Sequence, residues 1–293
     1  PPVVTPAVHV RHASQATILA SARAGSRIVA VGEHGVVLLS DDGGKTHRQA
    51  RQVPVDVSLT SVSFVDERLG WAVGHWGVIL QTSDGGETWQ LQRSDTQQDR
   101  PLFAVHFFNA KEGVAVGLWS LVLLTTDGGA QWQSLELQPP EGSRRADLNL
   151  LGLFADEQGR LFAPAERGMV LRSDDHGKQW RYLTTGYAGS FWTGIAVTGG
   201  ALLVGGLRGS LYRSSDDGQT WQRLDTGSKS SITTLVAQGP QVIGVGLDGL
   251  ILRSGDAGAS FSLHARKDRL PLTTAVFDEK GRPILYSRQG LVP

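Results

Sequence analysis

Six copies of one short motif divide this sequence into units of similar length. The motif is acidic and rich in glycine, and it usually ends in tryptophan, as in "TSDGGETW" at residues 82–89. Its aspartates, spaced by 42, 43, 48, 41 and 40 residues, are Asp42, Asp84, Asp127, Asp175, Asp216 and Asp256. A period of 40–50 residues indicates a propeller or a solenoid. The longest interval contains an insertion of loop-forming residues, "QPPEGSRRAD" at 138–147.

Each unit also contains four short apolar runs separated by turn-forming residues. In the second unit these runs are "LTSVSFV" (59–65), "GWAVG" (70–74), "GVILQT" (77–82) and "TWQLQ" (88–92). Runs of this length, bounded by Gly, Asp and Ser, favour β-strands, and no segment shows sustained helical periodicity. Four-stranded antiparallel units in tandem predict an all-β propeller, an architecture that leaves few sheet edges open.

The repeat predicts a single domain of seven blades over residues 1–293. After the sixth motif the pattern resumes with "PLTTAVFD" (271–278), "RPILYS" (282–287) and "GLV" (290–292), and no fourth strand follows. We predict that "AVHVRH" (7–12) supplies this outer strand of the last blade and so closes the ring. The predicted blades are 15–52, 59–93, 102–137, 148–185, 191–226, 231–265, and 271–293 together with 7–12.

The motif lies between the third and fourth strands of each unit, where the chain needs a compact turn. Its leading Ser or Thr and its Asp can accept backbone N–H bonds, and its glycines provide positive φ. The closing aromatic residue falls on the fourth strand, where it can pack on a neighbouring sheet. A calcium site would need more oxygen ligands at regular spacing than the motif offers. We therefore interpret the six aspartates as structural, and the pattern resembles the Asp-box of sialidase-type repeats.

Composition argues against several kinds of site. The chain has no cysteine, which excludes disulfides and thiolate ligands, and its 28 basic residues balance 28 acidic ones, which gives no global attraction to nucleic acid. No apolar run approaches the ~20 residues that span a bilayer. The histidines show no ligand spacing, and no nucleotide-binding or hydrolase motif stands in a suitable context. We predict no enzyme activity, no metal and no cofactor.

A carbohydrate-active propeller, hydrolase or lectin, remains the alternative, because Asp-box propellers have diverse functions. A glycosidase requires two carboxylates at a set separation. Glu33, Glu166 and Asp248 could face one another around the axis, and Tyr187 is the tyrosine that could reach the surface.

The unit "GWAVGHWGVILQTSDGGETW" (70–89) resembles the Ycf48 family, also called the photosystem II stability and assembly factor family. The resemblance extends, with decay, over essentially the whole chain. It implies seven blades, export to the lumen or periplasm, no catalysis, and binding of a protein client, which in photosynthetic members is a nascent membrane subunit. The sequence begins "PPVVTPAVHV", which either a removed export signal or a trimmed start would explain. We expect an exported monomer that binds a protein client.

The turns between the second and third strands should lie on the face opposite the Asp-boxes, and we call this the turn face. Its turn tips vary in chemistry where the Asp-boxes are uniform, which favours recognition on this face. The predicted protein-binding residues are His75, Trp76, Trp119, Glu166, Arg167, Arg208, Asp248 and Arg288. Alternatively, Trp76 and Trp119 fill gaps between turns.

The resemblance also implies an arginine-rich patch. Arg167 and Arg208 occupy matching turn positions, and three further arginines each precede an Asp-box, namely Arg172, Arg213 and Arg253. These three are candidates either for such a patch or for a solvated strand edge.

Overall fold

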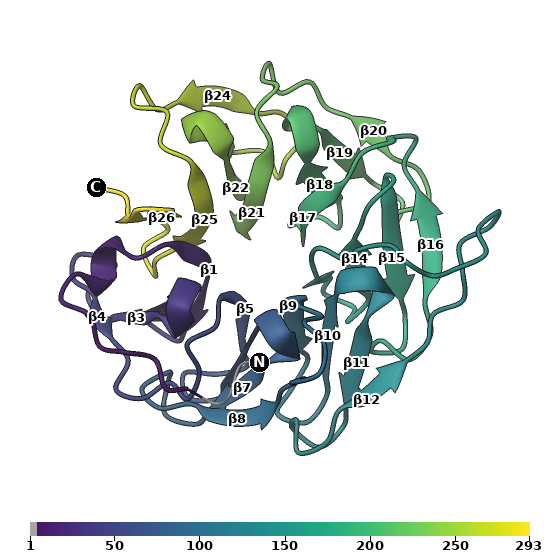
Figure 1. The fold of residues 1–293 in the computed structure, drawn as a ribbon. Helices are drawn as coiled ribbons and strands as arrows, with labels where there is room; N and C mark the ends of the chain where they lie inside the picture. Colours follow the sequence, from purple (N-terminus) through teal and green to yellow (C-terminus); the bar gives the residue numbers. More distant parts are fainter. Residues whose placement is uncertain (1–4) are drawn as a thin grey trace.

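Seven antiparallel sheets are arranged in a ring around a central axis (Figure 1). The structure, a computed structural model, describes residues 5–293. Six sheets have four strands and the seventh has three, and within each sheet the strands follow one another in chain order. The chain is therefore an all-β propeller of seven blades, as its repeat predicts.

The strands are grouped here by their position within a blade. The first strands, nearest the axis, are β1 (Ile18–Ala24), β5 (Leu59–Phe64), β9 (Leu102–Phe107), β13 (Phe154–Ala155), β17 (Phe191–Ala196), β21 (Ile232–Gln238) and β25 (Leu272–Phe277). The second strands are β2 (Arg27–Gly32), β6 (Gly70–Gly74), β10 (Gly113–Gly117), β14 (Leu161–Pro164), β18 (Leu202–Gly206), β22 (Gln241–Gly246) and β26 (Pro283–Ser287). The third strands are β3 (Val37–Ser40), β7 (Ile79–Thr82), β11 (Val122–Thr125), β15 (Met169–Ser173), β19 (Leu211–Ser214), β23 (Leu250–Ser254) and β27 (Gly290–Leu291). The fourth strands are β4 (Arg48–Gln49), β8 (Gln90–Arg93), β12 (Gln133–Leu135), β16 (Arg181–Thr184), β20 (Gln222–Arg223) and β24 (Ser262–Ala265).

Six short 3₁₀ turns complete the described part of the chain. They are η1 (Ala13–Gln15), η2 (Glu33–Gly35), η3 (His75–Gly77), η4 (Leu118–Ser120), η5 (Leu207–Gly209) and η6 (Leu247–Gly249). Five of them, η2 to η6, connect a second strand to a third strand. Within residues 5–293, none of these helical segments has the length and apolar character to cross a membrane.

The core consists of seven apolar clusters, each between two consecutive blades. The second strands contribute to it from both faces, and β6 and β10 are buried at every position. Because both faces are covered, these strands read as continuous apolar runs rather than as alternating patterns. The cluster that contains Ile18, Ile28, Val276 and Tyr286 joins blade seven to blade one and closes the ring.

The segment 7–12 does not join blade seven, which corrects the predicted ring closure. The sheet of blade seven contains β25, β26 and β27 only. The segment lies instead along the outer end of blade one, where the N–H of Ala7 donates to the carbonyl of Val53 at 2.9 Å. The side-chain amide of Gln49 accepts a hydrogen bond from the N–H of Val10 at 3.1 Å. The side chain of Gln49 thus bonds to backbone groups of this segment that a neighbouring strand in blade seven would otherwise have paired.

Blade seven is joined to blade one by side chains of the two sheets. His47 Nε2 lies 2.7 Å from the hydroxyl oxygen of Tyr286, and the two rings meet edge to face. Ser21 Oγ lies 2.9 Å from Thr274 Oγ1. Burial lowers the pKa of His47 and raises the pKa of Tyr286, so both groups are neutral near pH 7. His47 stands where the other Asp-boxes carry Trp or Phe, and it gives the closing joint a polar contact.

We predict that Tyr286→Phe lowers the free energy of unfolding by about 1–3 kcal/mol, because it leaves a partly buried nitrogen of His47 without its partner. The pKa of His47 is lowered in the folded state. Its contribution to stability should therefore be complete above about pH 6.5 and be lost as the pH falls. Urea unfolding at several pH values measures both effects. The control is Tyr182→Phe, which removes a hydroxyl bonded to Gln138 at an exposed site. Equal losses in the two variants would contradict the role of the joint.

Candidate functional site

Each Asp-box forms the same hydrogen-bonded turn. In blade two, Thr82 Oγ1 donates to Asp84 Oδ1 at 2.9 Å and accepts from the N–H of Gly86 at 2.9 Å. Asp84 also accepts from the N–H of Thr88 at 2.9 Å and from its hydroxyl at 2.6 Å. The bond from the leading Ser or Thr to the carboxylate recurs at Asp42, Asp127, Asp175, Asp216 and Asp256. All six carboxylates are thus engaged by the turn itself.

The electrostatics of the boxes follow from these hydrogen bonds. Bonds from the hydroxyl and then the N–H of Thr46 lower the pKa of Asp42 to about 2. At Asp84 burial raises the pKa, but the bonds from Thr88 and Thr82 outweigh it and the net pKa is lowered. The carboxylates of Asp42 and Asp84 are therefore ionised at any pH above the ordinary aspartate range.

The fourth residue of an Asp-box also contacts the preceding blade. The carbonyl of Gly128 accepts a hydrogen bond from Trp71 Nε1 at 3.1 Å, and the carbonyl of Asp217 accepts one from Arg172 at 3.0 Å. Arg172 is only 8% exposed, and its Nε donates to Asp174 at 2.7 Å. It is therefore part of a joint between blades. Arg253 is exposed and Arg213 half-buried, so the three arginines before the boxes do not share one environment.

The turn tips share one backbone geometry. The second residue of six tips has a left-handed φ of 53–59°, and these residues are His34, Trp76, Trp119, Arg167, Arg208 and Asp248. The first residue of each tip is half-buried. The second residue is exposed in every one of these tips except that of blade two, where Trp76 is half-buried. The left-handed residue thus presents its side chain on the turn face.

The two predicted tryptophans have different environments. Trp76 packs on the apolar cluster between blades one and two, and Asp99 accepts its N–H at 2.8 Å and lies 3.6 Å from His75 Nδ1. Trp119 is 51% exposed. The gap-filling alternative therefore describes Trp76, whereas Trp119 leaves half of its ring free for contact.

Two of the three predicted carboxylates bind neighbouring loops. Glu166 accepts the N–H of Asn149 at 2.6 Å. Asp248 accepts hydrogen bonds from Ser230 at 2.8 Å and from Arg269 at 3.0 Å. Glu33 lies in blade one, whereas Glu166 and Asp248 lie in blades four and six, and the side chain of Glu33 is half-buried.

The remaining predicted residues are separate from one another. Arg167, Arg208 and Arg288 are exposed and come from blades four, five and seven. Tyr187 packs on Phe191 and donates its hydroxyl to the carbonyl of Leu207 at 3.1 Å. It therefore contributes to packing rather than to a free surface.

The tip of blade three is held by the segment that leads into blade four. Asn149 Oδ1 accepts the N–H of Trp119 at 3.0 Å, and the carbonyl of Leu148 accepts the N–H of Ser120 at 2.7 Å. Ser120 itself has a left-handed φ of 56° at a position where the tips of blades one, two, four, five and six carry glycine. These bonds fix the backbone from which the ring of Trp119 projects.

A cleft of about 400 Å³ opens beside Trp119, between blade three and the insertion at 138–147. Its apolar lining includes Leu121, Leu137 and Pro139. Its cationic lining consists of Arg100, Arg144 and Arg145. The insertion was predicted only as a loop, and the pair Arg144-Arg145 within it was the available signal for this cleft.

The arginines of this cleft have no acidic partner. Within residues 5–293, Arg100, Arg144 and Arg145 take part in none of the ion pairs. A terminal nitrogen of Arg100 donates to the carbonyls of Leu118 and Trp119, both at 3.1 Å, and its Nε is buried without a partner. The cleft thus combines a half-exposed indole with three arginines that form no ion pair, and one carboxylate, that of Glu136, also lines it.

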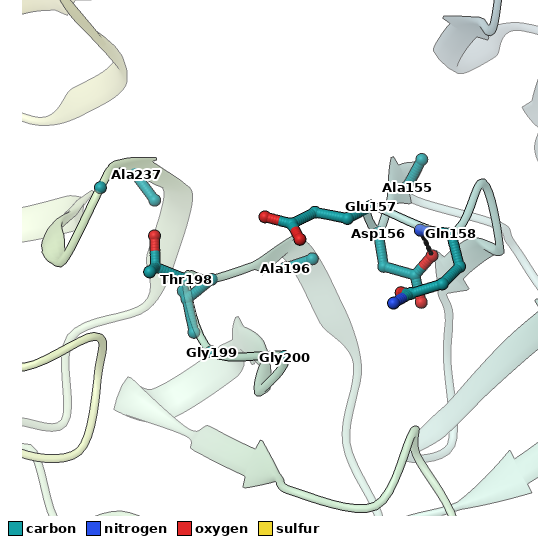
Figure 2. Close-up of a pocket in the computed structure, with 11 residues that line it drawn as sticks. Ala155, Asp156, Glu157, Gln158, Ala196, Thr198, Gly199, Gly200 and Ala237 are labelled. Atoms are coloured by element: carbon teal, nitrogen blue, oxygen red, sulfur yellow. Dashed lines mark hydrogen bonds between the residues drawn. The ribbon is translucent and has the colours of Figure 1, made fainter.

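A second cleft, of about 530 Å³, lies on the Asp-box face among the first hairpins of blades four to six. Figure 2 shows the side chain of Glu157 extending toward Ala196 and Thr198, while Asp156 accepts the N–H of Gln158. Most of the lining is alanine and glycine. In the described part of the chain, no three His, Asp or Glu residues are grouped so as to hold a metal ion.

Comparison with known proteins identifies the family. The model of a family described as "Photosynthesis system II assembly factor YCF48" matches residues 49–200, about half of the chain. This chain belongs to the YCF48 family. The description of the YCF48 family names an assembly factor and not a catalyst. A comparison with curated proteins gives no significant match.

Two solved YCF48 structures show the same fold. One, described as "YCF48 bound to D1 peptide", has a TM-score of 0.76 and 19% identity over 97% of this chain and 94% of that chain. The other, YCF48 from Cyanidioschyzon merolae, has a TM-score of 0.75 and 16% identity over 97% of both chains. At these identities the similarity establishes the fold.

We predict that Asp84→Ala lowers the free energy of unfolding by about 1–2 kcal/mol, because the N–H of Thr88 and two hydroxyls lose their acceptor. Thermal or urea unfolding measures the loss. The control is Asp56→Ala at an exposed aspartate outside the boxes, which should change stability by less than about 0.5 kcal/mol. A calcium-dependent melting temperature that Asp84→Ala abolishes would contradict the structural interpretation of the boxes.

Proposed function

We propose that this protein binds a client polypeptide in the cleft beside Trp119 and acts as an assembly or stability factor for a membrane or envelope complex. The observation that carries the proposal is the half-exposed indole of Trp119 beside three arginines that lack acidic partners. Membership of the YCF48 family supports the role in assembly. The YCF48 structure described as bound to D1 peptide supports a peptide as the client.

The chemistry of the cleft indicates which segment it takes. Aromatic and arginine side chains provide most of the binding energy in many interfaces. Arginines that form no ion pair are available to bind carboxylates, because the guanidinium offers paired donors in a fixed geometry. A cleft of about 400 Å³ has room for a few side chains. We therefore propose an extended segment that carries both acidic and apolar residues.

The other exposed tips have a secondary role in this proposal. Arg167, Arg208 and Arg288 lie on the same face as Trp119 but outside the cleft. Exposed charges act mainly on the rate of association and are screened by salt. These arginines should therefore attract an acidic client from solution, while the cleft holds it. His75, Trp76, Glu166 and Asp248 support the tips through the contacts described above.

Export to the lumen or periplasm and a monomeric state are further parts of the proposal. Their support is the resemblance of the repeat unit to a family of exported propellers. Fractionation of cells that express the full-length natural protein tests the location, and light scattering of the purified protein tests the monomer.

We predict that Trp119→Ala weakens client binding by at least about tenfold, since a buried aromatic anchor typically contributes 2 kcal/mol or more. Thermal stability should change little, because half of the ring is exposed. The matched control is Leu263→Ala, which shortens another exposed apolar side chain on β24. The affinity is measured with a synthetic D1 peptide. In a separate experiment, a photo-crosslinker placed at Ala146 in the cleft captures the client, and the captured amount is compared between variants.

The charge reversal Arg144→Glu/Arg145→Glu should weaken the same binding and reduce its dependence on salt. The control is Arg223→Glu on the exposed strand β20. A client captured equally from Ala146 and from Leu263 would contradict the assignment of the cleft. So would a Trp119→Ala variant that binds as tightly as the unmodified protein.

A further inference from the structure

The joint between blades three and four contains a histidine in a backbone position that favours glycine. His176 is the fourth residue of its Asp-box and has a φ of 60°. The equivalent residues of blades one to three are Gly43, Gly85 and Gly128. A residue with a Cβ adopts this left-handed conformation at a cost. The side chain of His176 makes an interaction that offsets this cost.

That interaction crosses the boundary between the blades. His176 Nδ1 lies 2.8 Å from Glu112 Oε2, which belongs to the first hairpin of blade three. The imidazole also stacks on the ring of Phe108, with centroids 4.0 Å apart and an interplanar angle of 12°. On the side of blade three, His106 meets Phe108 edge-on at 4.7 Å.

We propose that His176 and Glu112 form a pH-dependent clasp between blades three and four, which tightens when the imidazole is protonated. A charged imidazole converts the contact into a charge-assisted hydrogen bond, which is stronger than a neutral one. The positive charge would also lie over the face of the Phe108 ring, where the electrons of the ring attract cations. Histidine is the side chain that ordinarily changes charge between pH 5 and 8.

The charged groups around the clasp agree with this assignment. Glu112 also accepts a hydrogen bond from Asn109 at 3.2 Å, and Lys178 of the Asp-box lies near its carboxylate. Lys111 belongs to the same hairpin and donates its backbone N–H to Asn109. Burial and the neighbouring His176 lower the pKa of His106 to about 4, so His106 stays neutral over the relevant range.

The carboxylates on the side of blade four are already engaged. Asp156, in the hairpin that approaches His176, is bonded to Arg160, and Glu157 of that hairpin extends into the second cleft. In its own box, Asp174 is bonded to Arg172 and Asp175 to Ser173. Glu112 is therefore the carboxylate in direct contact with the imidazole.

The direction of the pH dependence follows from the two partners. The hydrogen bond from His176 lowers the pKa of Glu112. The contribution of Glu112 is therefore present above its ordinary pKa of about 4.3 and is lost as the pH falls through the lowered value. Protonation of an imidazole adds the second charge of the clasp, and histidine ordinarily gains this charge between pH 8 and 5. The clasp should therefore be stronger at pH 5.5 than at pH 8.

The next joint provides a matched internal control. Asp217 occupies the same position in the Asp-box of blade five, with a φ of 61°, and accepts a hydrogen bond from Arg160 of blade four at 2.7 Å. Aspartate and arginine both remain charged from pH 5.5 to 8. This pair has the same backbone geometry as the clasp but no titration in that range.

The test compares His176→Gly with Asp217→Gly by thermal unfolding at pH 5.5 and pH 8. We expect His176→Gly to lower the melting temperature by about 2 °C or more at pH 5.5. At pH 8 it should cause no loss or a small gain, because glycine relieves the left-handed backbone. Asp217→Gly should have the same effect at both pH values. Titration of His47 is common to all variants and cancels in the differences.

A second variant identifies the partner. Glu112→Gln should lower the melting temperature at pH 5.5 as His176→Gly does. The double variant His176→Gly/Glu112→Gln should melt no lower than the less stable of the two single variants. NMR titration of the His176 ring provides a readout that is independent of unfolding, and Glu112→Gln should move its midpoint to lower pH. The same loss from His176→Gly at both pH values, or an unchanged midpoint in Glu112→Gln, would overturn the proposal.

Discussion

Apolar packing between neighbouring sheets is the interaction on which the whole propeller depends. Each blade buries both faces of its second strand, so no blade has a complete core of its own. The seven clusters between blades provide the driving force, since burial of apolar area is the dominant favourable term in folding. The seventh cluster, with Ile18 and Tyr286, makes the array a ring without a strand shared between the two ends of the chain. Because this packing lies between the blades, the turn tips on the face opposite the Asp-boxes are free to vary.

The Asp-boxes add a polar layer to this packing. The carboxylate and the leading hydroxyl fix the turn within a blade, and the fourth residue bonds to the preceding blade. The residues that fix the turn within a blade must be uniform, because this turn depends on short and specific hydrogen bonds. The fourth position tolerates more variety, because the contact is made by the backbone carbonyl at Gly128 and Asp217 and by the side chain at His176. Gly128, His176 and Asp217 illustrate three solutions at this one position.

The fold was predictable from sequence because its signals are local and repeated: strand length, turn residues and a constant period. The way in which the ring closes could not be predicted, because the position of residues 7–12 depends on hydrogen bonds to the amide of Gln49 in blade one. The site was predictable only in part. Trp76 and Trp119 occupy identical tip positions, and only packing against the cluster between blades one and two distinguishes them. Arg172 was misleading because Asp217, which contacts it, comes from the next blade. Residue spacing contains none of this information.

The location of the cleft follows from the same division between core and surface. The interval that contains residues 138–147 is the longest between consecutive boxes. Added chain can be accommodated there, because long surface loops cost little in closure entropy. The insertion brings Arg144 and Arg145 beside Trp119 without altering a core cluster. The tip itself is fixed by Asn149 and Leu148, which follow the insertion directly. A rigid tip next to an added loop allows recognition chemistry to change while the sheets on either side keep their packing.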